Sequence, residues 1–177
     1  SAGVDPLVPL EAVELPGRHM LHNVLAASAV AFVAGAAPVA MAAGLAGFHG
    51  LEHVMEPAGQ VGGVRFINDS KATNVESAAR SIEAFDGVVA LIGGRFKGGD
   101  LRELREPLRA HARAVVAIGE SAGLVRDAVA DVVPVEIAGS MREAVALGYR
   151  RARPDGVVLL APACASFDWF GDYAERG

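Results

Sequence analysis

Two loops of the sequence carry lysines in settings that favour the binding of an anion. The first is Asp69-Ser70-Lys71-Ala72-Thr73-Asn74, which places an acid, a cation and three hydrogen-bonding side chains within six residues. Thr73 or Asn74 is explained as the N-cap of a following helix. Lys71 is not explained in this way, because a positive charge is unfavourable close to a helix N-terminus unless an anion joins it. The loop is therefore either a plain strand-to-helix connection or an anion site.

The second loop is Gly93–Asp100, which is rich in glycine and contains Lys97. It has neither the G-x-x-x-x-G-K-[ST] order of a phosphate-binding loop nor the G-x-G-x-x-G order of a dinucleotide-binding turn. It is either a flexible loop with incidental cations or a loop that brings Lys97 to a carboxylate. One such charge pair at about 4 Å, with an effective dielectric near ~20, gives roughly 4 kcal/mol of Coulomb energy before desolvation. Two lysines that each bind one carboxylate of the same ligand would make the site selective for dicarboxylates.

A third polar segment, residues 161–168, turns from a predicted strand end into a predicted helix and consists largely of small residues, which allow a ligand to approach closely. Ser166 is expected to cap that helix, to donate a hydrogen bond to a ligand, or to do both. Cys164 has no histidine partner implied by the sequence, so we expect a buried small side chain and not a nucleophile. Tyr173 is expected to pack or to wall a small pocket.

The elements that position these loops alternate along the chain. Short continuous apolar runs, such as Val88–Ile92 and Val157–Leu160, are typical of strands buried on both faces of a parallel sheet. Alternating strands and helices predict an α/β, Rossmann-like fold, with a mostly parallel sheet and helices on both faces. The predicted elements are helix 74–85, strand 88–92, helix 101–112, strand 114–118, helix 121–130, strand 132–137, helix 139–152 and strand 156–161.

Each candidate loop follows the end of a predicted strand. The strands and the loops that follow them are 64–68 with 69–74, 88–92 with 93–100, and 157–161 with 163–168. Ligands of α/β sheets bind at the carboxyl ends of the strands. We therefore expect the three loops to converge on one edge of the sheet and to form one functional site.

The first part of the chain has a different character. An alanine-rich helix is predicted from about Met20 to Ala34, because alanine has the best intrinsic helix propensity. A second helix begins at Pro38 and ends near Phe48. The stretch Val24–Leu45 is interrupted and too rich in alanine for a membrane span, so a pair of buried helices is expected. The pair has few polar positions, which indicates a missing neighbour that covers it.

The sequence pattern changes at Leu51, from alanine-rich predicted helices to predicted strands that alternate with helices. We place a boundary there between a first domain, residues 1–50, and a second domain, residues 51–177. The second domain is expected to open with an antiparallel pair of strands at 52–57 and 63–68, which leads into the first candidate loop.

The composition limits the possible partners. The 177 residues carry a net charge of −5, which argues against nucleic-acid binding because neutralising phosphates needs a concentrated basic face. The single cysteine excludes an internal disulfide and fits a reducing cytoplasm. No signal peptide is visible at the start, and the histidines lack the spacing of a metal site. We expect a cytoplasmic protein with no nucleic-acid or membrane partner.

Three motifs resemble those of the Mur ligases of peptidoglycan synthesis. They stand in the family's order: Asn68–Asn74, then Gly93-Gly94 with Lys97, then Pro162–Asp168 leading to Arg176-Gly177. The D-S-K-A-T-N form is most similar to that of the members that add D-glutamate to UDP-N-acetylmuramoyl-L-alanine. The resemblance runs from about Gly17 to the end of the sequence.

The resemblance implies a domain organisation and an activity. The family has a UDP-binding domain, a central ATPase domain with a phosphate loop, and a Rossmann-like domain that presents D-glutamate. Residues 1–50 would be the last helices of the central domain, and residues 51–177 the D-glutamate domain. The implied activity is that of a monomeric, ATP- and Mg²⁺-dependent ligase that forms an acyl phosphate and serves cell-wall biogenesis, cell shape and cell division. The phosphate loop and the main Mg²⁺ ligands would precede Ser1, a helix would follow Gly177, and the chain alone would be inactive.

The resemblance also implies roles for individual residues. The D-glutamate pocket would consist of Lys71, Thr73, Lys97, Ser166, Phe167 and Tyr173. The nucleotide side would comprise Asn23 at the adenine, His53, and Asp69 at the ribose. Both lysines would meet the carboxylates of D-glutamate, with Lys71 also taking the catalytic role, while the two hydroxyl groups would donate hydrogen bonds.

Two residues depart from the family pattern. Met20 stands where the family usually has asparagine, and Val54 stands where it usually has arginine. Both positions lie on the nucleotide side in relatives, so polar recognition of ATP would be weaker, by about a few kcal/mol if both lost hydrogen bonds are buried. Two other functions stay open: a stand-alone module that binds an amino acid or a nucleotide without catalysis, and a nicotinamide dehydrogenase domain, which the missing glycine fingerprint disfavours.

Overall fold

The computed structural model describes residues 8–10, 13, 15 and 18–177. The chain divides into two compact units, residues 1–50 and residues 51–177. In the first unit, α1 (Arg18–Val33) and α2 (Pro38–Ala46) form the predicted helical pair, and Pro38 stands at the start of its helix as expected. That this unit is the end of a central ATPase domain stays a prediction.

The helical pair exposes much of its apolar surface within this chain. Met20, Val24 and Met41 are buried, whereas Val33 and Val39 are 87% and 79% exposed. The expected burial of both helices is therefore not provided by the described residues, in keeping with the prediction that a neighbour is missing. None of the helices in the described part of the chain has the length and hydropathy that a membrane span requires.

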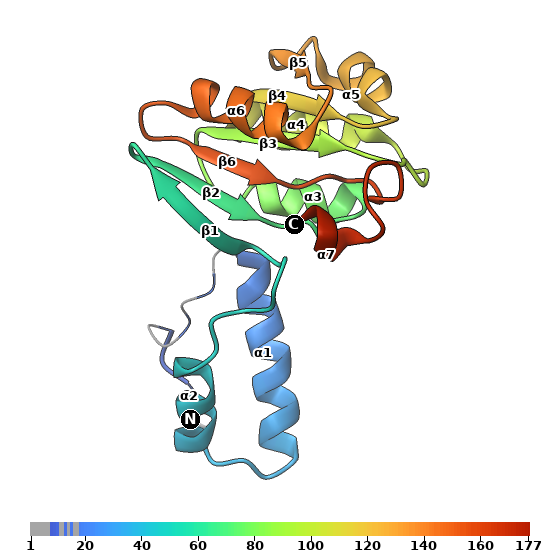
Figure 1. Ribbon diagram of the computed structural model, residues 1–177. Coiled ribbons are helices and arrows are strands. Elements are labelled where there is room, and N and C mark those ends of the chain that lie inside the picture. The colour runs from blue at the N-terminus through green and yellow to red at the C-terminus, as the bar shows by residue number, and fades with distance from the viewer. Residues whose placement is uncertain (1–7, 11–12, 14, 16–17) are drawn as a thin grey trace. The chain divides into compact units, whose positions relative to one another are not determined.

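The second unit is built on one six-stranded sheet with the strand order β1-β2-β6-β3-β4-β5 (Figure 1). The strands are β1 (Glu56–Val61), β2 (Val64–Asn68), β3 (Val88–Gly93), β4 (Ala112–Ile118), β5 (Val135–Ile137) and β6 (Val157–Leu160). Every neighbouring pair is parallel except β1 and β2, which are antiparallel. The predicted mostly parallel α/β sheet is confirmed.

Helices cover both faces of this sheet (Figure 1). They are α3 (Val75–Ile82), η2 (Leu101–Leu104), α4 (Arg105–His111), α5 (Ala122–Val129) and α6 (Met141–Ala152), with a short α7 (Tyr173–Arg176) near the end of the chain. Along β3, Ala90 and Ile92 belong to the core under α3, α4 and α5, whereas Val89 and Leu91 belong to the core under α6. This alternation explains the continuous apolar runs in the sequence, because successive side chains of a strand point to opposite faces.

Several predicted boundaries shift by a few residues; the strand predicted at 132–137, for example, is only Val135–Ile137, and the helix predicted at 74–85 is Val75–Ile82. Two differences change the elements themselves. The first strand of the second unit begins at Glu56 and not at residue 52, because His53 and Met55 have φ angles of 62° and 50°, which an extended strand cannot accommodate. The helix predicted at 101–112 is a 3₁₀ turn followed by α4.

Candidate functional site

Backbone hydrogen bonds join the three candidate loops at the carboxyl ends of β2, β3 and β6. The amide of Ala163 donates to the carbonyl of Ala72 over 3.0 Å, which joins the third loop to the first. Arg95 and Ala165 exchange two backbone bonds of 2.9 and 3.0 Å, which joins the third loop to the second. The predicted convergence of the loops on one edge of the sheet is therefore confirmed.

The first loop is held by its own local bonds. The side chain of Asn74 accepts a 2.8 Å hydrogen bond from the amide of Ser77, so Asn74, and not Thr73, is the N-cap of α3. The amide of Lys71 donates to the carbonyl of His53 over 3.1 Å. The cap thus leaves the Thr73 hydroxyl for other partners, and the Lys71 side chain is exposed.

Both lysines of the chain lie at these loops. The sequence contains two lysines, Lys71 and Lys97. The Nζ of Lys97 donates to the Oγ1 of Thr73 over 3.3 Å, and the Nζ of Lys71 lies 5.9 Å from the centre of the Tyr173 ring. Among the residues that the structure describes, neither lysine has a carboxylate within ion-pair distance. Two cations without a protein counter-ion suit an anionic ligand.

The other cation of the glycine-rich loop is already paired. Arg95 lies 3.0 Å from the carboxylate of Glu120. Hydrogen bonding to Arg95 lowers the pKa of Glu120, and the same contact raises the pKa of Arg95. Of the two cations in this loop, only Lys97 is therefore available to a ligand among the described residues.

The predicted pocket residues of the third segment differ in exposure. Ser166 is buried, while Phe167 is 60% exposed and Tyr173 is 39% exposed. The helix expected to begin at Ser166 is not present: residues 167–170 form a turn, and α7 begins only after Asp172, whose side chain accepts from the amide of Glu175 over 2.8 Å. The prediction that Ser166 caps a helix was therefore wrong, and its role as a ligand donor stays a prediction.

Cys164 is fully buried, as expected. Its Sγ lies 3.4 Å from the Oγ of Ser121. Burial raises the pKa of the Cys164 thiol. A neutral, enclosed thiol is a poor nucleophile, so the interpretation of Cys164 as a packing residue is confirmed.

On the predicted nucleotide side, Asp69 is buried and fixed by the protein. Its Oδ1 accepts from the amide of Met55 over 3.2 Å, and its Oδ2 accepts a short hydrogen bond from the hydroxyl of Ser81. These bonds tie the end of β2 to the turn before β1 and to α3. A role of Asp69 at a ribose stays a prediction.

His53 lies in a polar cluster beside Tyr173. The amide of Ser70 donates to the Oδ1 of Asn68 over 3.1 Å, which fixes the orientation of that side-chain amide. The Nδ2 of Asn68 therefore faces the Nδ1 of His53 at 2.9 Å. The imidazole ring lies edge-on to Tyr173, with ring centres 6.0 Å apart. Asn23 is an exposed residue of the other unit, where its Nδ2 lies 3.8 Å from the sulfur of Met20.

One residue that sequence reasoning left without a role is Arg176. Its guanidinium is buried and contacts both Ser70 and Cys164. Burial lowers the pKa of Arg176 to about 10, so it stays protonated near neutral pH. The sequence offered one signal, the place of Arg176 at the end of the third motif.

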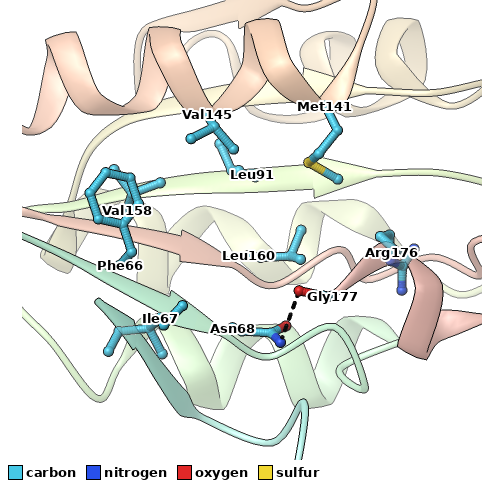
Figure 2. A pocket seen from close by; sticks show the side chains of 11 residues that line it. Phe66, Ile67, Asn68, Leu91, Met141, Val145, Val158, Leu160, Arg176 and Gly177 are labelled. Atoms are coloured by element: carbon cyan, nitrogen blue, oxygen red, sulfur yellow. Dashed lines mark hydrogen bonds between the residues drawn. The ribbon is translucent and has the colours of Figure 1, made fainter. Parts of the chain in front are cut away.

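A hollow of about 160 Å³ lies on the α6 face of the sheet, lined mainly by apolar side chains and at one part by Asn68, Arg176 and Gly177. Figure 2 shows Met141 and Val145 reaching from α6 toward Leu91, with Phe66 and Leu160 completing an apolar wall. None of the six predicted pocket residues lines it. An apolar hollow does not suit a dicarboxylate, so it is not the predicted glutamate pocket.

The fold and the loops define the class of this protein: a Rossmann-like α/β domain with a basic site at the carboxyl edge of its sheet. The family model described as "Mur ligase, glutamate ligase domain" matches residues 55–164, more than half of the chain. The chain belongs to this family, and the resemblance noted in its motifs is confirmed.

Curated relatives agree with this assignment. The chain is 43% identical to the UDP-N-acetylmuramoylalanine–D-glutamate ligase of Acidobacterium capsulatum, over 99% of this chain and 38% of that protein. It is 44% identical to the ligase of the same name from Marinobacter nauticus, over 99% of this chain and 40% of that protein. The chain thus spans about two fifths of the length of these relatives.

Solved structures share the fold. A folylpolyglutamate synthase of Mycobacterium tuberculosis in complex with ADP superposes with a TM-score of 0.65 at 21% identity, over 86% of this chain and 39% of that chain. A UDP-N-acetylmuramate-alanine ligase of Thermotoga maritima gives 0.64 at 17% identity, over 93% of this chain and 37% of that chain. At these identities the likeness shows the fold alone.

Proposed function

We propose that this chain binds and presents D-glutamate as part of a ligase that adds D-glutamate to UDP-N-acetylmuramoyl-L-alanine. The observation that carries the proposal is that Lys97 reaches from the second loop to Thr73, two residues from Lys71 in the first loop, with no carboxylate in ion-pair distance of either lysine among the described residues. The names of the curated relatives support the choice of ligand.

The chemistry of D-glutamate fits the groups at the loops. The ligand has two carboxylates, and each lysine provides a cation for one of them. Because the Oγ1 of Thr73 accepts from Lys97, its hydroxyl proton is left to donate to a carboxylate oxygen. In the proposal, Ser166 donates a second hydrogen bond to the ligand. The aromatic rings of Phe167 and Tyr173 lie along the methylene groups of the ligand.

Catalysis by these residues consists of positioning and charge neutralisation. In the proposed reaction, the amine of D-glutamate attacks a carboxyl carbon of UDP-N-acetylmuramoyl-L-alanine that is activated as an acyl phosphate. The carbon–nitrogen bond forms, the carbon–oxygen bond to phosphate breaks, and the amine loses a proton. Lys71 takes its catalytic role by holding a carboxylate of D-glutamate so that the amine faces this carbon.

The residues that the structure describes do not form a Mg²⁺ site. Among the described residues, no group of three or more His, Cys, Asp or Glu side chains is placed to hold a metal ion. The sequence also has no phosphate-binding loop. We therefore assign Mg²⁺ and the phosphates of ATP to parts of the ligase that this chain does not span, and give Asn23, His53 and Asp69 supporting roles on the nucleotide side. The proposal includes a monomeric, cytoplasmic enzyme of peptidoglycan synthesis that serves cell shape and division.

Both lysines can be observed directly in a binding experiment. Reductive methylation with isotope-labelled formaldehyde keeps the charge of a lysine and gives NMR signals for Lys71, Lys97 and the terminal amine. Lys71→Met and Lys97→Met variants assign the two lysine signals. D-glutamate is expected to shift both signals with one dissociation constant, and L-glutamate is the matched control for stereochemistry.

The outcome separates the proposal from the alternatives. If saturating D-glutamate moves neither lysine signal, the proposed pocket is wrong. If ATP moves these signals and D-glutamate does not, the chain is instead a nucleotide-binding module.

A further inference from the structure

Arg176 joins the two loops that carry Lys71 and Ser166. Its Nε donates to the Oγ of Ser70 over 2.9 Å, and its Nη2 donates to the carbonyl of the same residue over 2.7 Å. Its Nη1 donates to the carbonyl of Cys164 over 3.0 Å. One side chain therefore fixes the residue directly before Lys71 and a residue two positions before Ser166.

The helix that carries Arg176 is part of the same arrangement. The Oγ of Ser70 donates to the carbonyl of Tyr173 over 2.6 Å, so the serine hydroxyl receives one bond from α7 and returns another. Tyr173 presents its ring to the Nζ of Lys71. The backbone around three of the six proposed pocket residues thus depends on contacts of Arg176 or of its helix.

The second loop, Gly93–Asp100, also lies against this guanidinium. A Cβ added at Gly94 would lie 3.3 Å from the Nη1 of Arg176. Gly94 precedes Arg95, which pairs with Ala165, and the same loop carries Lys97. Arg176 consequently borders all three loops of the candidate site.

A purely structural role explains this residue poorly. The residue is 5% exposed, and no described carboxylate lies within ion-pair distance of it. Burying a cation against neutral acceptors costs more free energy than filling the same space with an apolar side chain. What an apolar side chain cannot do is hold two carbonyl groups and a hydroxyl in a fixed arrangement.

We propose that Arg176 is a positioning residue for D-glutamate, which sets the Lys71 loop and the Ser166 loop at the spacing that one ligand requires. This inference rests on the proposed function. Arg176 acts by holding the loops that carry the pocket residues, and the inference requires no direct contact between Arg176 and the ligand.

The test measures D-glutamate binding to the full 177-residue chain, again through the methylated lysine signals. Arg176→Met is expected to raise the dissociation constant at least about tenfold, because three hydrogen bonds that order the loops are lost. Arg176→Lys keeps the charge and part of the bonding, so a smaller increase is expected. Without ligand, the Lys71 signal is expected to move in Arg176→Met, since Tyr173 and Ser70 are released, while the Lys97 signal changes less.

Arg113→Met is the matched control. Arg113 also donates to a backbone carbonyl, that of Ala152 over 3.1 Å, and it lies outside the three loops. It is expected to lower stability without changing the dissociation constant or the Lys71 signal. This comparison separates positioning from a general loss of stability.

Each result has one meaning. Weaker binding in Arg176→Met, together with unchanged binding in Arg113→Met, supports the inference. Equal binding in the folded Arg176→Met and wild-type chains overturns it and leaves the proposed function intact; if Arg176→Met does not fold, equal binding by Arg176→Lys overturns it instead. No binding by the wild-type chain overturns the proposed function, and the inference with it.

Discussion

Adding one methyl group at Gly94 is expected to damage the site, whereas the same change at Gly98 is expected to be milder. Both glycines lie in the second loop and have positive φ angles, 127° and 108°. An alanine at either position therefore carries a backbone strain of about 1–3 kcal/mol. At Gly98 no other atom lies within 4 Å of the added Cβ, so the strain is the whole expected cost.

At Gly94 the added Cβ would overlap the carbonyl oxygen of Ala165. That oxygen accepts from Arg95, and relieving the overlap disturbs the paired bonds of 2.9 and 3.0 Å between the second and third loops. Losing both bonds adds about 1–3 kcal/mol at a typical net value per bond. Gly94→Ala is therefore expected to cost about 2–6 kcal/mol in total, against about 1–3 kcal/mol for Gly98→Ala.

Urea unfolding followed by tryptophan fluorescence measures this difference. The sequence contains one tryptophan, Trp169, which directly follows the third segment and so reports on the second unit. The midpoint is expected to fall further in Gly94→Ala, with an unchanged slope. D-glutamate binding is expected to weaken in Gly94→Ala under native conditions and to be kept in Gly98→Ala. Equal midpoints for the two variants would refute the claim that the Arg95–Ala165 pairing holds the loops together.

Three further predictions concern the Cys164 thiol and the first unit. Cys164 is expected to resist alkylation in the native chain and to react rapidly in urea, as mass spectrometry would record; rapid native labelling would contradict its burial. Burial raises the pKa of this thiol, so the unfolded chain loses the proton first, and the free energy of unfolding is expected to fall as the pH rises above about 8.5. Cys164→Ala should remove that part of the pH dependence. Finally, the exposed apolar side chains of α1 and α2 are expected to bind a hydrophobic dye, and a chain of residues 51–177 should bind less of it; equal dye binding by both chains would place the apolar surface elsewhere.

The buried strands were predictable from sequence because burial on both faces leaves a continuous apolar run. Val88–Ile92 and Val157–Leu160 show this in β3 and β6. Once those strands are parallel, their carboxyl ends share an edge, so the meeting of the three loops follows from the fold class.

What the sequence did not reveal depends on contacts between distant residues. Positive φ angles at His53 and Met55 move the start of the first strand to Glu56, and neither position is a glycine or an asparagine that would have indicated them. The start of α7 was missed because the cap is Asp172 and not Ser166. Arg176 stands in a run of polar residues that is typical of a surface, and only the carbonyl groups of Ser70 and Cys164 make its burial favourable.

The distribution of ion pairs gives a separate reason to place an anion at the loops. In the described part of the chain, every ion pair is made by an arginine or a histidine. The chain has 21 acidic residues against 16 lysines and arginines, so acidic partners are plentiful. Yet Lys97 reaches Thr73, two residues from Lys71, and Glu120 pairs with Arg95 and leaves Lys97 without a carboxylate partner among the described residues. Other described cations also lack an ion pair, namely Arg65, Arg142, Arg150, Arg153 and Arg176. The two lysines, however, are both exposed on adjoining loops. That placement favours a ligand with two negative charges, because a second carboxylate doubles the Coulomb attraction where a single one would leave one lysine unsatisfied.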